Sequence, residues 1–213
     1  MTCSLKKILA SFVLSSYLAT QAGAALQTNE PKLLPVPIIF QATDYSCGAA
    51  ALLGLLMYWK AWDAGESTLY GELETTPTHG TKPGKILDFM VKRNFKAELR
   101  LNTTLESVFQ AVDNKEPVIV ALQAWADTPP PTYENVWDHG HYAVVIGYDA
   151  TNIYFMDPSA GKSYGKLTQA EFLVRWHDED EIEGKQTKAQ HIAIFAKGEK
   201  TIPAFPDAFE EIK

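Results

Sequence analysis

Three things are scarce in this sequence of 213 residues: cysteine, positive charge and long uninterrupted apolar segments. Its two cysteines are too few for a disulfide-rich scaffold or a four-cysteine zinc site. With 19 Lys+Arg against 26 Asp+Glu, the chain has no broad positive field for phosphate backbones, and we expect no nucleic-acid partner. No segment reaches the roughly 20 apolar residues of a membrane-spanning helix, and we expect no integral membrane span.

Apolar residues, in contrast, make up 46% of the chain and include five Trp, which argues against intrinsic disorder. The length suits one ordinary globular domain, and no internal repeat or low-complexity linker divides it. We expect a lead-in segment over 25–36, one domain over 37–197 and an acidic tail over 198–213.

The first 24 residues have the three parts of a secretory signal peptide. Lys6 and Lys7 form a basic region, residues 8–18 are mostly apolar, and small residues that a signal peptidase recognises end at Ala24. A membrane anchor is the alternative, but the apolar run of about eleven residues is half of what a span needs. We therefore expect cleavage after about Ala24 and export to the periplasm or beyond the cell.

Cleavage there would remove Cys3 and both lysines, which changes the formal net charge from −7 to −9 and leaves Cys47 as the one cysteine. A lone thiol in an oxidising compartment is open to oxidation. Two interpretations of Cys47 therefore remain: a small buried core residue, or a nucleophile retained for its chemistry.

Apolar periodicity predicts helices early in the domain and strands later, which is typical of the α+β class. We expect helices over 48–62, 67–73, 82–93, 104–112 and 168–176. We expect strands over 96–101, 117–123, 141–148, 153–156 and 192–196, with a loop over 124–136 and a hairpin joining 141–148 to 153–156. Ser46 and Thr168 stand where helix-capping residues are expected.

The surroundings of Cys47 meet the requirements of a cysteine nucleophile. Cys47 opens a predicted helix, whose unpaired N–H groups and dipole favour a thiolate. Gly48 lets a substrate backbone approach closely. Gln41 lies shortly before Cys47 in the chain, so its amide and the Cys47 N–H can together form an oxyanion hole.

The predicted hairpin offers a general base and an acid to orient it. His141 begins the first strand and Asp157 follows the second, so an antiparallel pairing brings the two ends near each other. The strand register decides whether the two side chains share a face, and the sequence alone does not determine that register.

These segments resemble a known family. Gln41-Ala-Thr-Asp-Tyr-Ser-Cys47-Gly-Ala-Ala, His141-Tyr-Ala-Val-Val-Ile-Gly-Tyr-Asp and Met156-Asp157-Pro158 are similar to the bacteriocin-processing, double-glycine leader peptidase domain of the papain-like cysteine peptidases. The resemblance extends from about Val36 to Ala196. It implies a fold in which an N-terminal helical part carries the Cys and an antiparallel sheet carries the His and the Asp.

Residue by residue, the resemblance implies that Cys47 is the nucleophile, His141 the base, Asp157 the orienting acid and Gln41 the oxyanion donor. The implied substrate is a peptide or protein, and no cofactor is implied.

Two departures from the family pattern matter. The transporter-linked members carry membrane spans and an ATP-binding module, of which this sequence shows neither, so leader cleavage coupled to transport does not carry over. Many members have Asp where this chain has Ser46, which bears on substrate contacts.

Three functions are compatible with these residues. The expected one is an exported cysteine peptidase. The second is an acyl transferase or amidase, as in phytochelatin-synthase-like enzymes, which uses the same thioester with a different acceptor. The third is a non-catalytic peptide-binding module, which has no need for the set of Gln41, Cys47, His141 and Asp157.

Other polar residues are candidate metal ligands. His139 and His141, with Asp138 and His177 nearby in sequence, offer zinc ligands, but no third ligand stands at a fixed spacing and we expect no metal. We expect His139 at the mouth of the cleft or in solvent. The acidic run 178–181 lacks the ligand spacing of a calcium loop and is expected to be a solvated loop.

The remaining histidines and several aromatic residues have plainer expectations. We expect His79, His177 and His191 to be exposed or hydrogen-bonded. Trp59, Trp62, Phe89 and Phe109 are expected in the core, and Trp137 either walls the cleft or packs.

Overall fold

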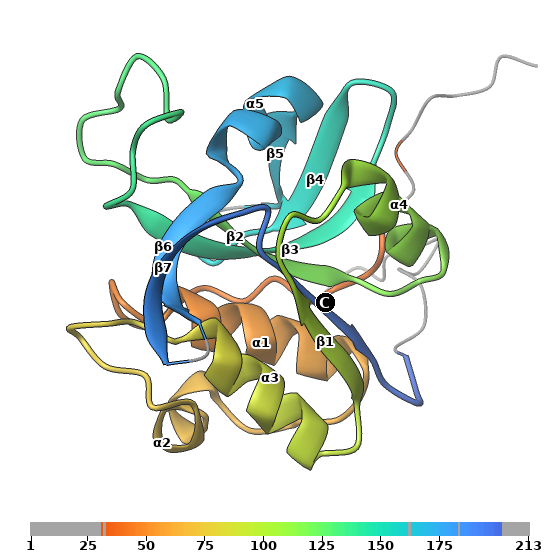
Figure 1. The fold of residues 1–213 in the computed structure, drawn as a ribbon. Helices are drawn as coiled ribbons and strands as arrows, with labels where there is room; N and C mark the ends of the chain where they lie inside the picture. Colours follow the sequence, from red (N-terminus) through yellow and green to blue (C-terminus); the bar gives the residue numbers. More distant parts are fainter. Residues whose placement is uncertain (1–30, 32, 162, 183, 202–213) are drawn as a thin grey trace, which may run out of the picture.

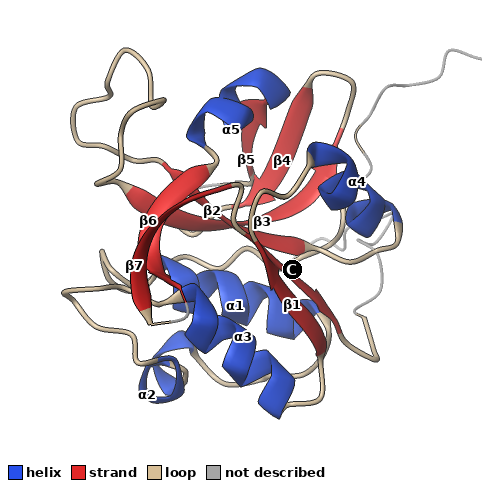
Figure 2. Ribbon diagram, in the orientation of Figure 1, coloured by secondary structure: helices blue, strands red, loops and turns tan. Residues whose placement is uncertain are grey.

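The computed structural model describes residues 31, 33–161, 163–182 and 184–201. The predicted signal peptide, most of the lead-in segment and most of the acidic tail lie outside the described residues. The described part begins with helices and continues into antiparallel strands (Figure 1, Figure 2), so the predicted α+β class is confirmed. No helix among the described residues combines the length and the apolar character needed to cross a membrane.

Helix α1 (Cys47–Tyr58) is the central helix of the fold. It is a run of Ala and Leu, which favour helix, and all but two of its residues are buried. A helix that is apolar on all sides must be covered on all sides, and α1 lies between strand β3 and helix α3. The helix ends before the predicted residue 62, because Lys60 adopts a left-handed backbone conformation with φ 52°.

The predicted helix over 67–73 is split in two. Residues Glu66–Thr68 form a 3-10 turn (η1), and α2 is a single turn, Tyr70–Leu73. Helix α3 (Pro83–Lys92) agrees with its prediction, with Pro83 in the first turn and one buried apolar face.

Six strands of the described residues form one antiparallel sheet in the order β1-β8-β2-β3-β4-β5. Their bounds are Lys96–Arg100 (β1), Val118–Gln123 (β2), Gly140–Tyr148 (β3), Asn152–Met156 (β4), Gly165–Thr168 (β5) and Ala193–Lys197 (β8). The predicted β3–β4 hairpin is confirmed, and the Asp149 carboxylate stabilises its turn by accepting the N–H groups of Thr151 and Asn152. The last strand of the described chain, β8, lies inside the sheet, between β1 and β2.

The sheet separates two apolar cores, because side chains along a strand alternate between its faces. Ile119, Val144 and Met156 belong to the core that contains α1 and α3. Val120, Ala143 and Phe155 belong to the opposite core, with residues of α4 (Leu105–Asp113) and α5 (Gln169–Arg175). Both of these helices have side-chain caps: Thr104 accepts the N–H of Ser107, and Thr168, as predicted, accepts that of Glu171.

The prediction of a solvated loop over residues 178–181 is wrong. The acidic run is not a solvated loop: it forms β6 (His177–Ile182), which pairs with β7 (Lys185–Gln190) in a separate two-stranded sheet. Asp178 is 6% exposed and Asp180 is half-buried, whereas Glu179 and Glu181 lie on the outer face and pair with Lys188 and Lys82. The period of two that marks a half-buried strand is therefore present, but in charged residues.

The four aromatic residues predicted in the core belong to it or pack against it. Trp59 and Phe89 are buried, and Trp62 and Phe109 pack against the cores. Trp137 packs on the ring of His177, with ring centroids 4.4 Å apart.

Trp176, at the end of α5, is the largest fully buried side chain among the described residues and generates a test of the fold. Its ring stacks between Phe172 and His191, and its Nε1 donates to the Ile192 carbonyl at 2.9 Å. We expect Trp176→Ala to lower the free energy of unfolding by about 3–5 kcal/mol, measured by urea denaturation. The control is Leu173→Ala on the same helix, which is 41% exposed and should cost less than about 1 kcal/mol. Equal losses would contradict this description of the core.

Candidate active site

Cys47 is a free, half-buried thiol at the first position of α1. The prediction that the Ser46 side chain caps this helix is wrong. The Ser46 hydroxyl instead accepts the N–H of Thr43 and donates to the Thr43 carbonyl, which closes the turn before Cys47. The described first turn of α1 therefore has neither a side-chain cap nor an acidic residue, so its dipole remains available to an anion at Cys47.

Gln41 is tied by both backbone and side chain to the segment that follows β4. Its N–H donates to the Pro158 carbonyl at 3.1 Å, and its Oε1 accepts the Ser159 hydroxyl at 2.8 Å. Its Nε2 donates to the Thr43 carbonyl at 2.8 Å. A side-chain amide has two N–H donors, so one remains for another acceptor.

A further contact holds the loop between Gln41 and Cys47. The buried carboxylate of Glu66 accepts the N–H of Ala42 at 2.9 Å and the hydroxyl of Tyr70 at 3.0 Å. The η1 turn therefore anchors this loop from the helical side of the molecule.

His141 and Asp157 are hydrogen-bonded, with 2.8 Å between Nε2 and Oδ1. The register that pairs Val144 with Met156 places the two side chains on the same face of the sheet, as a diagonal pair. Asp157 also accepts the N–H of Ser159 at 2.8 Å and the indole N–H of Trp125 at 3.2 Å. The carboxylate is thus held on three sides, and the imidazole that it orients is only 5% exposed.

The charges of Cys47, His141 and Asp157 shift the pKa values of the imidazole and of the Asp157 carboxylate. Burial alone would lower the pKa of His141, but hydrogen bonding and charge from Asp157 and from Cys47 raise it to about 9. Burial alone would raise the pKa of Asp157, yet the hydrogen bond and charge of His141 lower it. The pair therefore favours an imidazolium beside a carboxylate at neutral pH, with the Cys47 side chain near the same ring.

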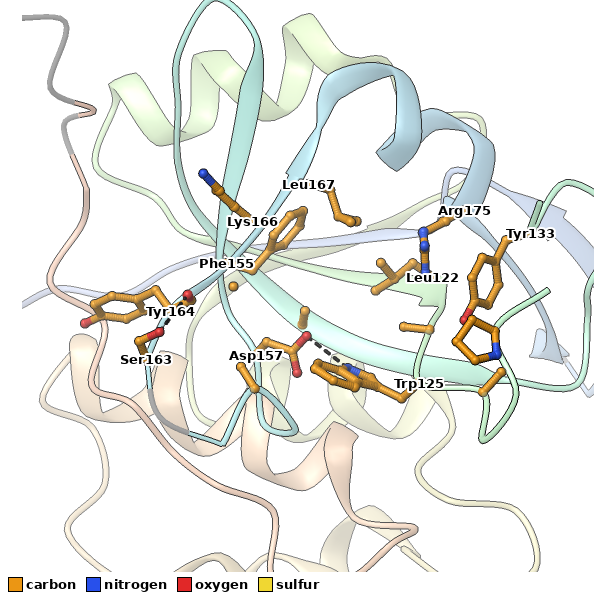
Figure 3. A pocket seen from close by; sticks show the side chains of 16 residues that line it. Leu122, Trp125, Tyr133, Phe155, Asp157, Ser163, Tyr164, Lys166, Leu167 and Arg175 are labelled. Carbon is orange, nitrogen blue, oxygen red and sulfur yellow. Dashed lines mark hydrogen bonds between the residues drawn. The ribbon is translucent and has the colours of Figure 1, made fainter. Parts of the chain in front are cut away.

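Trp125 is the site residue that the sequence analysis missed. It is 55% exposed, its backbone has φ 60°, and its indole donates to Asp157 (Figure 3) while lying edge-on to the His141 ring, centroids 6.5 Å apart. The available signal was an aromatic residue two positions after a buried strand, since β2 ends at Gln123 beside the start of β3. The indole covers the outer oxygen of Asp157.

Gly48 packs closely against two side chains of the protein. A Cβ at this position would come within 2.7 Å of the Thr81 Cβ and 3.2 Å of the Tyr142 ring, so Gly48 permits close packing within the protein. Tyr142 in turn donates its hydroxyl to Asp180 at 3.1 Å. This side of Cys47 is therefore filled by Thr81 and Tyr142.

The residues weighed as zinc ligands have other partners. The Nε2 of His141 is bonded to Asp157, and that of His177 lies 2.7 Å from the Val136 carbonyl. His139 remains 39% exposed at the surface, 3.8 Å from Asp138, and His191 bonds the Thr103 carbonyl. Among the described residues, no three His, Cys, Asp or Glu side chains gather as a metal site would require.

The structure thus gathers all four predicted residues: Cys47 beside His141, His141 on Asp157, and Gln41 on the segment that follows Asp157. They come from three parts of the chain: the loop before α1, the start of α1, and the β3–β4 hairpin.

Most of this chain matches a known protein family. Residues 33–181 match the model of a family described as "Peptidase_C39 like family". No curated protein matches the chain in sequence.

Several solved structures share the fold. A protein described as a C39-like peptidase from Bacillus anthracis is 18% identical with a TM-score of 0.60, and the match covers 81% of this chain and 100% of that one. The peptidase domain of Streptococcus ComA, a bifunctional ABC transporter of a quorum-sensing pathway, is 18% identical with a TM-score of 0.55, covering 77% and 99%. A double glycine motif protease from an AMS/PCAT transporter, solved with its leader peptide, is 18% identical with a TM-score of 0.51, covering 79% and 98%.

Asp178 generates a prediction on pH and stability. Burial raises its pKa from the ordinary 3.8 to about 7, so the folded state binds this proton more tightly than the unfolded state does. The contribution of Asp178 to stability is therefore greatest below about pH 4 and decreases as the pH rises to about 7. Asp178→Asn keeps an acceptor for the Gln123 amide but cannot ionise.

We expect Asp178→Asn to reduce the fall in unfolding free energy between pH 4 and pH 8 by roughly 2 kcal/mol, measured by urea denaturation at each pH. Glu106→Gln, an exposed carboxylate on α4, is the control and should leave the fall unchanged. The same pH dependence in wild type and Asp178→Asn would refute the assignment.

Proposed function

The chain belongs to the Peptidase_C39-like family of cysteine-type peptidases, and we propose that it cleaves peptide bonds with Cys47, His141, Asp157 and Gln41. The observation that carries this proposal is the 2.8 Å hydrogen bond between His141 and Asp157, on an imidazole whose pKa Cys47 also raises. A nucleophile, a base and an orienting group in contact are the requirement for covalent catalysis.

In the first step, the Cys47 sulfur attacks the carbonyl carbon of the scissile bond after its proton has passed to His141. The carbonyl oxygen becomes an oxyanion, for which the N–H groups at the start of α1 and the second N–H of Gln41 are the donors. The Ser159 hydroxyl on Oε1 keeps the amide of Gln41 oriented so that its nitrogen faces away from Ser159.

The C–N bond then breaks, and the His141 imidazolium gives its proton to the leaving amine, which leaves a thioester on Cys47. Neutral His141 next takes a proton from a water molecule that attacks the thioester, and the acid product and free thiol are restored. Asp157 stays ionised throughout and stabilises the imidazolium.

The proposed substrates are peptides or proteins, in keeping with the family. One similar fold was solved with a leader peptide bound, which supports a peptide as the substrate of this chain as well. Transfer of the acyl group to another acceptor would use the same thioester, so the products, not the residues, distinguish peptidase from transferase.

We also propose that the protein acts after export. The support is the signal-peptide pattern of residues 1–24, with its basic start, short apolar run and small residues ending at Ala24. N-terminal sequencing of the protein from a producing cell tests this: a start near Ala25 supports export, and an intact Met1 contradicts it.

The test of the activity is incubation of residues 25–213 with a peptide library in reducing buffer, read by mass spectrometry. We expect new peptide termini in wild type, and a loss of rate of at least 1,000-fold in Cys47→Ala and in His141→Ala because covalent catalysis is removed. Thermal unfolding should show both variants folded. Adducts on an added amine without new acid termini would indicate a transferase, and undiminished cleavage by either variant would refute the assignment.

The raised pKa of His141 predicts the alkaline limit of the activity. As the pH rises through about 9, the imidazolium loses the proton that the leaving amine needs, so kcat/KM should fall there. Asp157→Asn removes the carboxylate that holds this pKa up, so the alkaline limb should move to lower pH, along with a lower maximal rate.

The control for this profile is Glu98→Gln, an exposed carboxylate on β1 paired only with Arg100 in the described chain, which should leave the limb in place. An alkaline limb in Asp157→Asn at the wild-type pH would mean that Asp157 does not set the protonation of His141.

A further inference from the structure

A cavity of about 440 Å³ opens beside Asp157, on the face of the sheet that packs against α5 (Figure 3). Apolar side chains of four adjacent strands form its floor: Leu122, Ala143, Phe155 and Leu167. In Figure 3, Trp125 and Tyr133 lie toward one end, and Tyr164 and Lys166 toward the other. The volume falls in the range of sites that enclose organic ligands, and it is ample for one large amino-acid side chain.

The sheet register makes this floor continuous with the candidate catalytic pair. Leu122 is the direct partner of His141 across the β2–β3 ladder. Ala143 follows His141 by two residues, and Phe155 precedes Asp157 by two, so each points to the same face as its neighbour in the pair. An occupant of the cavity would therefore lie against the far side of the His141–Asp157 pair.

One side of the candidate active site is filled by side chains, and the other side leads to the cavity. On one side of Cys47, Gly48 packs tightly against Thr81 and Tyr142, and Tyr142 points to the opposite face of the sheet from its neighbour His141. On the other side lie Asp157 and Trp125, which form the edge of the cavity. The cavity thus extends the site in one direction, past the imidazole.

The chemistry decides which part of a substrate lies in that direction. The acyl half stays on Cys47 as the thioester, whereas the leaving amine must reach the His141 proton and hence pass over the imidazole. We infer that the cavity is the subsite for an apolar side chain in the part of the substrate that follows the scissile bond. The inference rests on the proposed peptidase function and adds a side-chain preference to it.

The charges at the cavity indicate what accompanies the apolar side chain. Among its lining residues, all within the described chain, Asp157 is the one carboxylate, and His141 and Trp125 already bind it. Arg175 is engaged by Glu171 and lies over the Tyr133 ring, whereas Lys166 is exposed at the rim. A substrate with a carboxylate next to its apolar residue complements this rim.

The experiment compares two peptides that share one scissile bond and differ after it, one with Leu-Glu and one with Ala-Glu in the cavity-facing positions. Wild type should have a kcat/KM at least tenfold higher for the Leu peptide, because only Leu fills the cavity. Ala124→Phe, a half-buried wall position, should fill the cavity and abolish the difference while Ala-peptide cleavage continues. Leu167→Ala enlarges the cavity and should shift the preference to a Trp peptide, which keeps the test valid if Ala124→Phe does not fold.

Charge is tested with a matched pair of edge-strand variants. Lys166→Glu on β5 should reverse the preference between Leu-Glu and Leu-Lys peptides by about tenfold, whereas Lys96→Glu on β1, also exposed but at the opposite edge of the sheet, should not. Indifference of wild type to the residue after the bond, or equal effects of the two Lys variants, would overturn the inference and leave the proposed peptidase function standing.

A binding measurement distinguishes failure of the inferred subsite from failure of the proposed peptidase function. Cys47→Ala, which cannot form a thioester, is titrated with both peptides by calorimetry. Tighter binding of the Leu peptide that is lost on adding Ala124→Phe supports the subsite, whether or not wild type cleaves. Equal or undetectable binding of the two peptides overturns it, and absence of cleavage by wild type alone counts against the peptidase function only.

Discussion

Helix α1 packs against β3, and this contact determines where Cys47 lies relative to His141. The helix is apolar on nearly every side, so it is stable only where the sheet and α3 cover it. Once α1 is covered in this way, its first residue comes to the end of β3 at which His141 begins, and the side chain of Cys47 reaches the imidazole. The reactive geometry is thus a by-product of core packing, and any loss of apolar contact along α1 changes it.

The second constraint is the β3–β4 register, which places His141 and Asp157 on one face. A shift of one residue would move Asp157 to the α1 face and leave the imidazole unpaired. Asp149 holds the turn, and Trp125 and Ser159 hold the carboxylate. The left-handed backbone of Trp125 costs energy in a bulky residue, and it is kept where the indole can reach Asp157.

Sequence reasoning anticipated the helices α1, α3, α4 and α5 and the strands β1, β2, β3, β4 and β8, which have an apolar run, an apolar period or a capping box. The constellation around Cys47 was also anticipated, because its residues stand at the ends of these elements. Strand β6 was missed because acidic residues occupy both its buried and its exposed positions. The charge of the run indicated a solvent-exposed loop instead. Trp125 and the true role of Ser46 depend on contacts between distant segments or within an irregular loop, to which no local pattern points.

The position of β8 has a consequence for how the molecule is made. The final described strand lies between β1 and β2, so β1 is joined to the ladder of β2 to β5 only when that strand is in place. A chain emerging from its N-terminus first, whether from a ribosome or through a membrane pore, presents Cys47 long before the sheet can close. A nascent chain therefore exposes Cys47 before β3 and β4 can bring His141 and Asp157 to it, and β8 is the final described strand to join the core around α1.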